Sequence, residues 1–115
     1  MPFDVVSNMT DVDAIFKALA HPFRREVLLW LADIEEYFPD YEHLFSGSIP
    51  ANAVGARSNL SQSTVSMHIA QLERSGLVTV RRIGQWTLLS RNEETIRKFA
   101  NWIDANLLGS QGSGI

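Results

Sequence analysis

Cysteine is absent from this sequence of 115 residues, so disulfide bridges, thiolate metal sites and thiol redox switches are excluded. The chain also has no apolar run close to the roughly 18 residues that a membrane-spanning helix requires. Its first residues, MPFDVVSNMTD, contain no basic segment of the kind that opens a secretory signal. At this length we expect one globular domain, located in the cytoplasm and without a membrane partner.

Motifs of catalysis and cofactor binding are missing as well. There is no Gly-rich phosphate loop, no Ser/His/Asp arrangement and no paired metal motif. The three histidines are scattered, and none lies four residues from another. We expect His21 to cap a helix, His43 to lie in a solvated loop and His68 to be structural or a DNA contact. The sequence therefore predicts a protein that is not an enzyme and that has no cofactor and no metal site.

Basic residues are few overall, and the formal net charge of −3 at first argues against a nucleic-acid partner. The charges are, however, unevenly distributed. Residues 1–56 contain three basic and nine acidic side chains, whereas residues 57–98 contain seven basic and three acidic ones. Such asymmetry is expected when one part of a molecule meets phosphate and the other does not. A DNA-binding element is therefore expected in the second half of the chain.

Residues 59–77, NLSQSTVSMHIAQLERSGL, have the features of the turn and second helix of a helix-turn-helix. Ser61 can cap this helix, because its hydroxyl can accept a hydrogen bond from a free N–H of the first turn. Gly76 follows the last turn, where a residue with positive φ commonly ends a helix. Three apolar residues at i, i+4 and i+7 form one stripe, namely Val65, Ile69 and Leu72.

The opposite face of this predicted helix is polar and almost uncharged, as suits a helix that enters the major groove. The amide of Gln62 can read adenine, and the hydroxyls of Ser63 and Ser66 can bond to a base or a phosphate. Met67 can contact a thymine methyl group. The alternative is that these are ordinary surface residues, although a merely solvated helix face usually carries several Lys and Glu.

A short helix over residues 50–58 is expected before the turn, with Asn59 in a positive-φ conformation at the turn itself. After the second helix, two β-rich runs, residues 78–82 and 86–90, are separated by a three-residue connection that contains Gly84, which predicts a hairpin. Arginines on a hairpin often only increase solubility, but here they can also reach phosphate. The candidate phosphate and wing contacts are Arg57, Ser61, Thr64, Arg81, Arg82 and Gln85.

Further helices are predicted towards both ends of the chain. Thr10 with Asp13 fits a capping box that opens a first helix, and Pro22 suits the first position of a second. Ser90 with Glu93 offers a capping box for a last helix. The segments outside these helices are a flexible N-terminal arm, 1–9, and a flexible tail, 109–115.

Two stretches of the sequence resemble the ArsR/SmtB family of bacterial winged-helix repressors. LSQSTVSMHIAQLERSGLV (residues 60–78) shares the family's Ser-Gln-Ser-Thr-Val-Ser, the His two residues later and the helix end in Gly-Leu-Val. IFKALAHPFRREVLLWLA (residues 15–32) is close to the family's opening signature. Together with the hairpin, the resemblance covers most of residues 12–105.

The resemblance implies a winged helix-turn-helix fold: a mainly α domain over residues 10–108 with four helices, a small β-hairpin and a fifth helix. Its parts are the helix-turn-helix at 50–75, the wing at 77–90 and a C-terminal dimerisation helix at 92–108. It also implies which positions read DNA bases, and these are Gln62, Ser63, Ser66, Met67 and His68.

A homodimer is expected, because one helix and one wing offer little surface for tight specific binding. The resemblance implies that the first and last helices form the two-fold interface, although part of each apolar stripe must pack inside its own protomer. The candidate interface residues are Val12, Ile15, Phe16, Leu19, Phe99, Trp102 and Ile103.

The predicted function is that of a sequence-specific regulator that binds double-stranded DNA, as a homodimeric repressor on an inverted-repeat operator. Many family members respond to metal through cysteines on the first helix of the motif or an acid/His set on the last helix. Residues 50–58 have no Cys and residues 92–108 have no His, so we expect a member that works without metal. The alternative is a winged-helix module that binds another protein, which the acidic overall charge favours. A small-molecule or protein effector stays open.

Residues 33–49, DIEEYFPDYEHLFSGSI, look like an insertion relative to the family pattern. The segment is acidic and rich in aromatic residues, and Pro39 interrupts any continuous helix. We expect a packed loop with one helical turn around residues 41–45. The insertion could form a pocket, contact a partner or widen the dimer interface, but packing over the flank of the helix-turn-helix is the first choice.

Overall fold

The structure is a computed structural model that describes the backbone of residues 5–108 and the side chains of residues 12–108. The predicted tail and the first four residues of the predicted arm lie outside these ranges. In chain order the elements are α1 (Val5–Leu19), α2 (Pro22–Ala32), α3 (Ile34–Tyr37), the 3-10 turn η1 (Pro39–Tyr41), β1 (Ile49–Pro50), α4 (Ala51–Ala56), α5 (Gln62–Arg74), β2 (Val78–Ile83), β3 (Trp86–Arg91), α6 (Glu93–Ile103) and the π-helical turn η2 (Asp104–Leu108).

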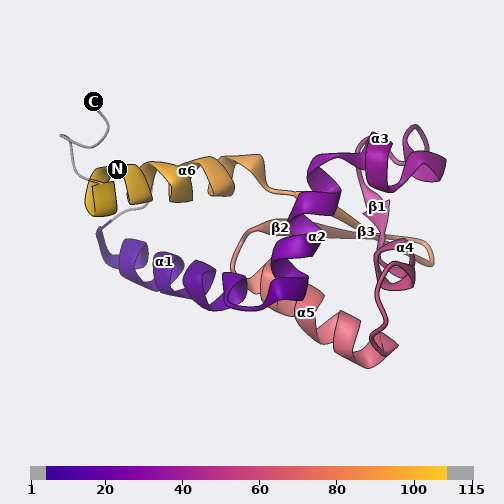
Figure 1. The fold of residues 1–115 in the computed structure, drawn as a ribbon, viewed down its shortest axis with the longest axis horizontal. Helices are drawn as coiled ribbons and strands as arrows, with labels where there is room; N and C mark the ends of the chain where they lie inside the picture. Colours follow the sequence, from indigo (N-terminus) through magenta and orange to yellow (C-terminus); the bar gives the residue numbers. More distant parts are fainter. Residues whose placement is uncertain (1–4, 109–115) are drawn as a thin grey trace.

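The molecule is elongated, with extents of 46 × 26 × 26 Å, and it has two halves (Figure 1). In one half α1 and α6 lie along each other and extend away from the rest of the molecule. The other half, here called the winged half, contains α2, α4, α5 and the sheet. Helices come first, a hairpin follows and a helix comes last, so the predicted winged helix-turn-helix fold is confirmed.

The hydrophobic core is shared by the helices and the sheet. Helical spacing places Ile15 of α1, Val27 of α2 and Leu72 of α5 on inward faces, and all three are fully buried. Ile49 and Leu89 bury their side chains from the sheet. Burying an aliphatic side chain of this size stabilises the fold by about 1.5–3 kcal/mol. Helix α5 and the wing therefore pack against the same core, which fixes their relative positions.

The sheet has three antiparallel strands in the order β1-β3-β2. The β2–β3 hairpin is the predicted wing, but Ile83 pairs with Trp86, so the connection has two residues rather than three. Gly84 has a φ of 59°, the positive value that two-residue hairpin turns of this kind require at their first position. Strand β1 was not predicted, because two residues are too few to show an alternating pattern.

The start of α1 differs from the prediction. The helix begins at Val5, so Thr10 lies inside it rather than at its cap. The predicted arm is therefore wrong for residues 5–9, and the Thr10–Asp13 capping box is wrong. Residues 5–9 contain no Pro or Gly, so nothing in this stretch interrupts a helix that continues into it.

The start of α6 also differs from the prediction. Asn92 is its N-cap, and the Asn92 Oδ1 accepts a hydrogen bond from the Thr95 N–H at 3.1 Å. The predicted cap, Ser90, is instead held in the sheet opposite Thr79. Because Ser90 has the extended backbone of a strand and lies two residues too early, it cannot cap this helix.

A positive φ was predicted at Asn59, in the turn between α4 and α5. The structure contradicts this prediction. Among the described non-glycine residues, only Ser46 has a positive φ, at 53°. The turn is stabilised by Ser58, whose hydroxyl donates to the Gly55 carbonyl at 2.7 Å and accepts from the Leu60 N–H at 3.2 Å. This local bonding replaces the conformational role expected of Asn59.

The insertion is packed, but its helical turns come earlier than predicted. They form α3 and η1 rather than a turn over residues 41–45. Asp33 caps α3 by accepting a hydrogen bond from the Glu36 N–H at 3.2 Å, and Pro39 then occupies the first position of η1, where proline is favoured. Phe38 between them is buried. Capping by Asp33 and the position of Pro39 therefore decide where the turns form.

Candidate nucleic-acid interface

The N-terminus of α5 carries a cluster of hydroxyl groups. Ser61 Oγ accepts a hydrogen bond from the Thr64 N–H at 3.2 Å, which confirms the predicted cap, and lies 2.9 Å from Thr64 Oγ1. Ser63 Oγ lies 3.2 Å from the same Ser61 oxygen. Because the helix dipole is positive at this end, the cluster is a favourable position for a phosphate group.

One face of α5 is exposed and free of formal charge. Gln62, Ser63, Ser66 and Met67 are all exposed on this helix, as predicted. No Asp, Glu, Lys or Arg occurs between Ser61 and Leu72. The structure therefore presents four of the five predicted base-reading residues at the surface.

His68, the fifth predicted base-reading residue, is buried, with 8% of its surface exposed. Its Nδ1 accepts a hydrogen bond from Arg24 Nε at 2.9 Å. Burial, the neighbouring Arg24 charge and the nearby His21 together hold the pKa of His68 below its ordinary value. The prediction is wrong because His68 lies three residues after Val65, on the inward face of the helix. Its role is structural.

Arg24 on α2 was not singled out from the sequence, although only 6% of its surface is exposed. Besides bonding to His68, its guanidinium donates to the Lys17 carbonyl at 3.5 Å and to Met67 Sδ at 3.8 Å. It therefore joins the end of α1, α2 and helix α5. A signal was present, because Arg24 lies three residues before the buried Val27 and so falls on the same face of α2.

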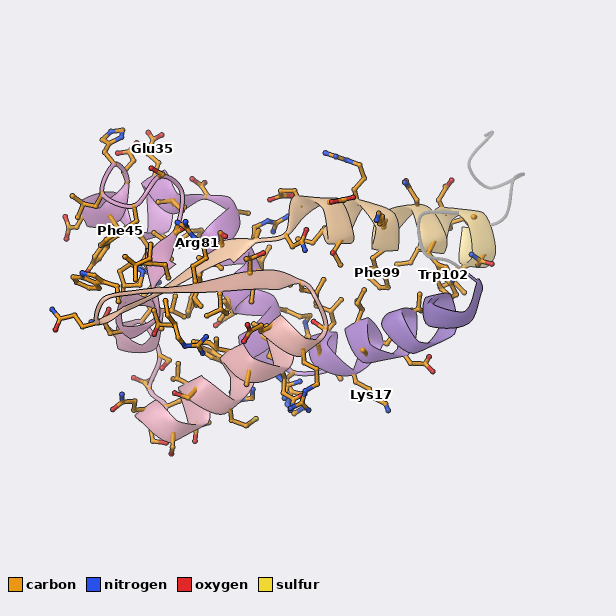
Figure 2. The ribbon with its side chains drawn as sticks, turned by 180° about the vertical axis from the view of Figure 1, so that it is seen from behind. Lys17, Glu35, Phe45, Arg81, Phe99 and Trp102 are labelled. Carbon is orange, nitrogen blue, oxygen red and sulfur yellow. The ribbon has the colours of Figure 1, made fainter. Side chains whose placement is uncertain are left out.

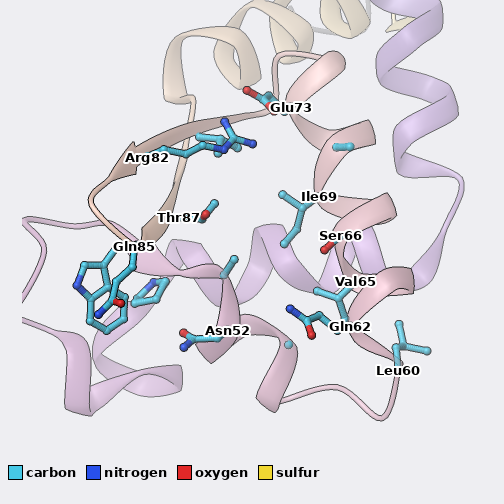
Figure 3. A pocket seen from close by; sticks show the side chains of 16 residues that line it. Asn52, Leu60, Gln62, Val65, Ser66, Ile69, Glu73, Arg82, Gln85 and Thr87 are labelled. Atoms are coloured by element: carbon cyan, nitrogen blue, oxygen red, sulfur yellow. The ribbon is translucent and has the colours of Figure 1, made fainter.

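A depression of about 670 Å³ opens between α4, α5 and the wing (Figure 3). Gln62 and Ser66 line it from α5, and Arg82 and Gln85 line it from the wing. Asn52, exposed on α4, adds a polar group that the sequence alone did not single out. The structure thus brings four predicted DNA-contact residues around one opening.

Part of the lining of this depression is apolar, and one acidic residue contributes to it. Val65 and Ile69 of α5 and Val80 of β2 contribute aliphatic side chains. Glu73, in the last turns of α5, lines the same depression as Arg82 (Figure 3). The depression therefore combines an aliphatic part with charged groups of both signs.

Arg81 and Arg82 are both exposed, but they do not share a face of the wing. Side chains alternate along a strand, so neighbouring residues of β2 point to opposite faces. Arg82 lines the depression and Arg81 does not. Of Arg81 and Arg82, only Arg82 lines the depression together with the exposed face of α5.

Arg57, another predicted phosphate contact, has partners within the protein. Its guanidinium lies over the rings of Trp30, Tyr37 and Phe38, at 5.0, 5.2 and 5.7 Å from the ring centroids. It also donates a hydrogen bond to the Tyr37 carbonyl at 3.0 Å. The structure therefore separates Arg57 from the depression and places it against the insertion.

The predicted dimer residues divide into two groups. Val12, Ile15 and Phe99 are buried in the protomer's own core, so the structure does not offer their side chains to a partner. Phe16 is 43% exposed and makes T-shaped contacts with the rings of Phe99 and Trp102, at centroid distances of 5.2 and 6.0 Å. Figure 2 shows Phe99 and Trp102 on α6. The partly exposed group is Phe16, Leu19, Trp102 and Ile103.

Within the part of the chain that the structure describes, no three His, Cys, Asp or Glu side chains come together as a metal site would require. None of the helices in residues 5–108 combines the length and apolar character needed to cross a membrane.

The fold and the site together define a class of protein. A capped helix with an exposed uncharged face, preceded by a helix and turn and followed by an arginine-bearing hairpin, is the arrangement of a winged helix-turn-helix DNA-binding domain. Residues 56–80 match the model of a family described as bacterial regulatory protein, arsR family. The chain is also 30% identical over 95 residues to the uncharacterized HTH-type transcriptional regulator YbzH of Bacillus subtilis (strain 168), and the match covers 81% of this chain and 95% of YbzH. The chain therefore belongs to the arsR family of transcriptional regulators, and it is not an enzyme.

Solved structures share the fold. An ArsR-like transcriptional regulator from Rhodococcus sp. RHA1 superposes with a TM-score of 0.68 at 18% identity, covering 94% of this chain and 88% of that one. HlyU from Vibrio cholerae superposes with a TM-score of 0.58 at 24% identity, covering 87% and 96%. The fold therefore agrees with the family membership that the curated relative and the family model show.

Proposed function

We propose that this regulator is a cytoplasmic homodimeric repressor that binds an inverted-repeat operator in double-stranded DNA and needs no metal. The observation that carries the proposal is the single opening shared by the uncharged face of α5 and the tip of the wing. A helix of this kind fits the major groove, while the wing reaches the adjacent backbone.

The exposed residues of α5 and the wing have different roles in this proposal. Gln62, Ser63, Ser66 and Met67 face the base edges, where amide, hydroxyl and methyl-contacting groups distinguish base pairs. Arg82 supplies a charge for phosphate. Hydroxyl and amide groups for hydrogen bonds to the DNA backbone come from Ser61, Thr64, Gln85 and Asn52.

The proposed two-fold interface uses the half of the molecule formed by α1 and α6. Phe16, Leu107 and Leu108 are 43%, 64% and 58% exposed there, and Trp102 and Ile103 are partly exposed. Pairing these helices between two copies would bury this apolar surface. The two recognition helices would then meet half-sites about 34–36 Å apart.

The test is a mobility-shift titration with random duplex DNA and with the region upstream of the protein's own gene, each at two salt concentrations. A repressor should bind the upstream region more tightly, and both affinities should fall steeply with salt because binding releases counterions. The alternative, a winged-helix module for another protein, is favoured by the net charge of −3. In that case neither duplex would be retarded at either salt concentration.

Independence from metal is tested in the same assay. Zinc and a chelator should each leave operator affinity unchanged, since the chain has no cysteine and its described part has no cluster of metal-ligating side chains. A large shift with either reagent would contradict this part of the proposal.

A further inference from the structure

The insertion contacts the wing close to its tip. The ring of Phe45, which is labelled in Figure 2, lies 5.2 Å from the ring of Trp86, centroid to centroid, and stacks with the ring of Tyr41 at 6.5 Å. Trp86 is the first residue of β3, directly after the Gly84–Gln85 turn. An aromatic pair therefore joins the insertion to the part of the wing that is proposed to meet DNA.

A second connection runs from the end of the insertion to the same strand. Ile49, the last residue of the insertion, pairs with Leu89 in the β1–β3 ladder. Leu89 lies in the core, whereas Trp86 is 38% exposed. The insertion thus holds β3 both at its buried middle and at its exposed end.

The insertion also contacts the C-terminal end of α4. Arg57 is the C-cap residue of α4, and its guanidinium lies over Tyr37 and Phe38 of the insertion and over Trp30 of α2. An arginine over aromatic rings is attracted by their π-electrons. Because the α4–α5 turn follows directly, this contact anchors the chain just before the recognition helix.

These contacts matter because a two-stranded ribbon is only marginally stable by itself. Between the buried residues Val78 and Leu88, no residue of the wing is buried, so no core side chain fixes its tip. Phe45 is only partly buried and lies outside the hydrophobic core, so its contact with Trp86 contributes little to core burial. Its evident effect is on the position of the tip.

We propose that the insertion positions the wing relative to the recognition helix, with Phe45 as the positioning residue. Phe45 itself need not touch DNA. By holding Trp86 it keeps Arg82 and Gln85 facing the exposed side of α5 before DNA arrives, which lowers the conformational cost of binding. The effect on DNA rests on the proposed DNA-binding function, whereas the effect on the wing does not.

The experiment compares Phe45→Ala with Leu44→Ala, a neighbouring substitution in the same loop at a side chain that is 64% exposed. Phe45→Ala should weaken binding to operator and random duplex alike, by roughly 2- to 10-fold, the scale expected for loss of one aromatic pair. Leu44→Ala should leave both affinities unchanged. Phe45→Tyr keeps the ring and should restore binding, and Phe45→Leu provides a milder variant should the alanine variant fold poorly.

A double-mutant cycle with Arg82→Ala tests whether Phe45 acts through the wing. If it does, Phe45→Ala should lower the affinity for DNA much less in the Arg82→Ala background, because a misplaced wing there no longer loses the Arg82 contact with phosphate. Equal losses in both backgrounds would overturn the proposal.

Amide hydrogen exchange measures the wing without DNA. In Phe45→Ala the amides of residues 82–87 should exchange several-fold faster, while those of α5 stay protected. Unchanged exchange at the wing tip would overturn the proposal whether or not the protein binds DNA. If the wild type retarded no duplex but the exchange result held, the DNA-binding proposal would fail and the positioning role would stand.

Discussion

Gln62 and Arg82 line the same depression, but they offer different chemistry to DNA. A glutamine amide can form two hydrogen bonds with adenine, and such a pair discriminates against the wrong base by about 1–3 kcal/mol. An arginine that contacts phosphate adds affinity for every sequence and contributes about one unit to the salt slope. Two substitutions at one opening should therefore have distinguishable effects.

We predict that Gln62→Ala mainly lowers the preference for operator, whereas Arg82→Ala weakens operator and random duplex about equally and reduces the salt slope by about one. The measurement is a titration of both duplexes at several salt concentrations. Equal loss of specific and random binding in the Gln62 variant would refute its base-reading role.

His68 gives a prediction about pH. Burial, with the charge of Arg24 and the nearby His21, lowers the pKa of His68 below its ordinary value of 6.5. The unfolded chain therefore binds a proton more readily than the folded one, and stability falls as pH drops below about 6.5. Above that pH the penalty is absent, because the histidine is neutral in both states.

Thermal unfolding between about pH 7.5 and about pH 5 tests this sign. The wild type should lose more stability on acidification than His68→Gln, in which the titrating group is absent. His43→Gln is the control, since His43 is exposed and should leave the wild-type slope unchanged. The same slope in all three proteins would contradict the role assigned to the buried ring.

At the scale of single elements, the cap of α6 gives a stability prediction. Asn92→Ala removes the acceptor for the Thr95 N–H and should cost about 1 kcal/mol. In a domain of this size that loss lowers Tm by roughly 4 °C. Ser90→Ala is the matched control: Ser90 was the cap expected from sequence but lies in β3, and its loss should leave Tm nearly unchanged. The reverse order of the two variants would show that the cap is assigned wrongly.

The elements that could be predicted from sequence are those with strong local signals. The sequence of α5 carries three such signals close together, namely the cap at Ser61, the apolar stripe and Gly76, whose φ is 85°. The turn at Gly84 is the corresponding signal for the hairpin. Strand β1 has no such signal, because its two residues form a strand only through pairing with β3. Local sequence patterns therefore predict single helices and hairpins better than they predict which elements pair in the fold.

The bond between Arg24 and His68 illustrates the same limit within the site. The two residues are 44 positions apart, so no local pattern joins them. His68 lies within a segment that resembles a base-reading helix, and only its contact with α2 shows that it points inwards. The aromatic partners of Arg57 were not predicted for a related reason, since they are on α2 and in the insertion.

At the scale of the whole molecule, the half formed by α1 and α6 explains why dimer contacts are hard to assign from sequence. Val12 and Phe16 are one helical turn apart on α1, yet they are 3% and 43% exposed. Both belong to one apolar stripe, and the helical spacing alone does not show which one the rest of the protomer covers. Phe16 therefore stays a candidate for the partner, whereas Val12 does not.

We predict that Leu107→Glu disrupts the homodimer. The side chain is 64% exposed directly after α6, so a carboxylate there should not disturb the protomer but would oppose burial against a second copy. Sedimentation should show a protomer, and operator affinity should fall by roughly tenfold or more because the two half-sites are no longer linked. Leu44→Glu, at an equally exposed position in the insertion, should stay dimeric. A dimer that survives Leu107→Glu would exclude this end of the molecule as the interface.

Glu73 shares the lining of the depression with Arg82. In the proposed complex its carboxylate repels the phosphates of any DNA sequence. This repulsion shortens the residence time of the protein on non-specific DNA without any contact to a base. Only at the operator would contacts to bases outlast this repulsion. A single acidic side chain would thus speed the search for the operator. Glu73→Gln would give a regulator that dissociates more slowly from non-specific DNA.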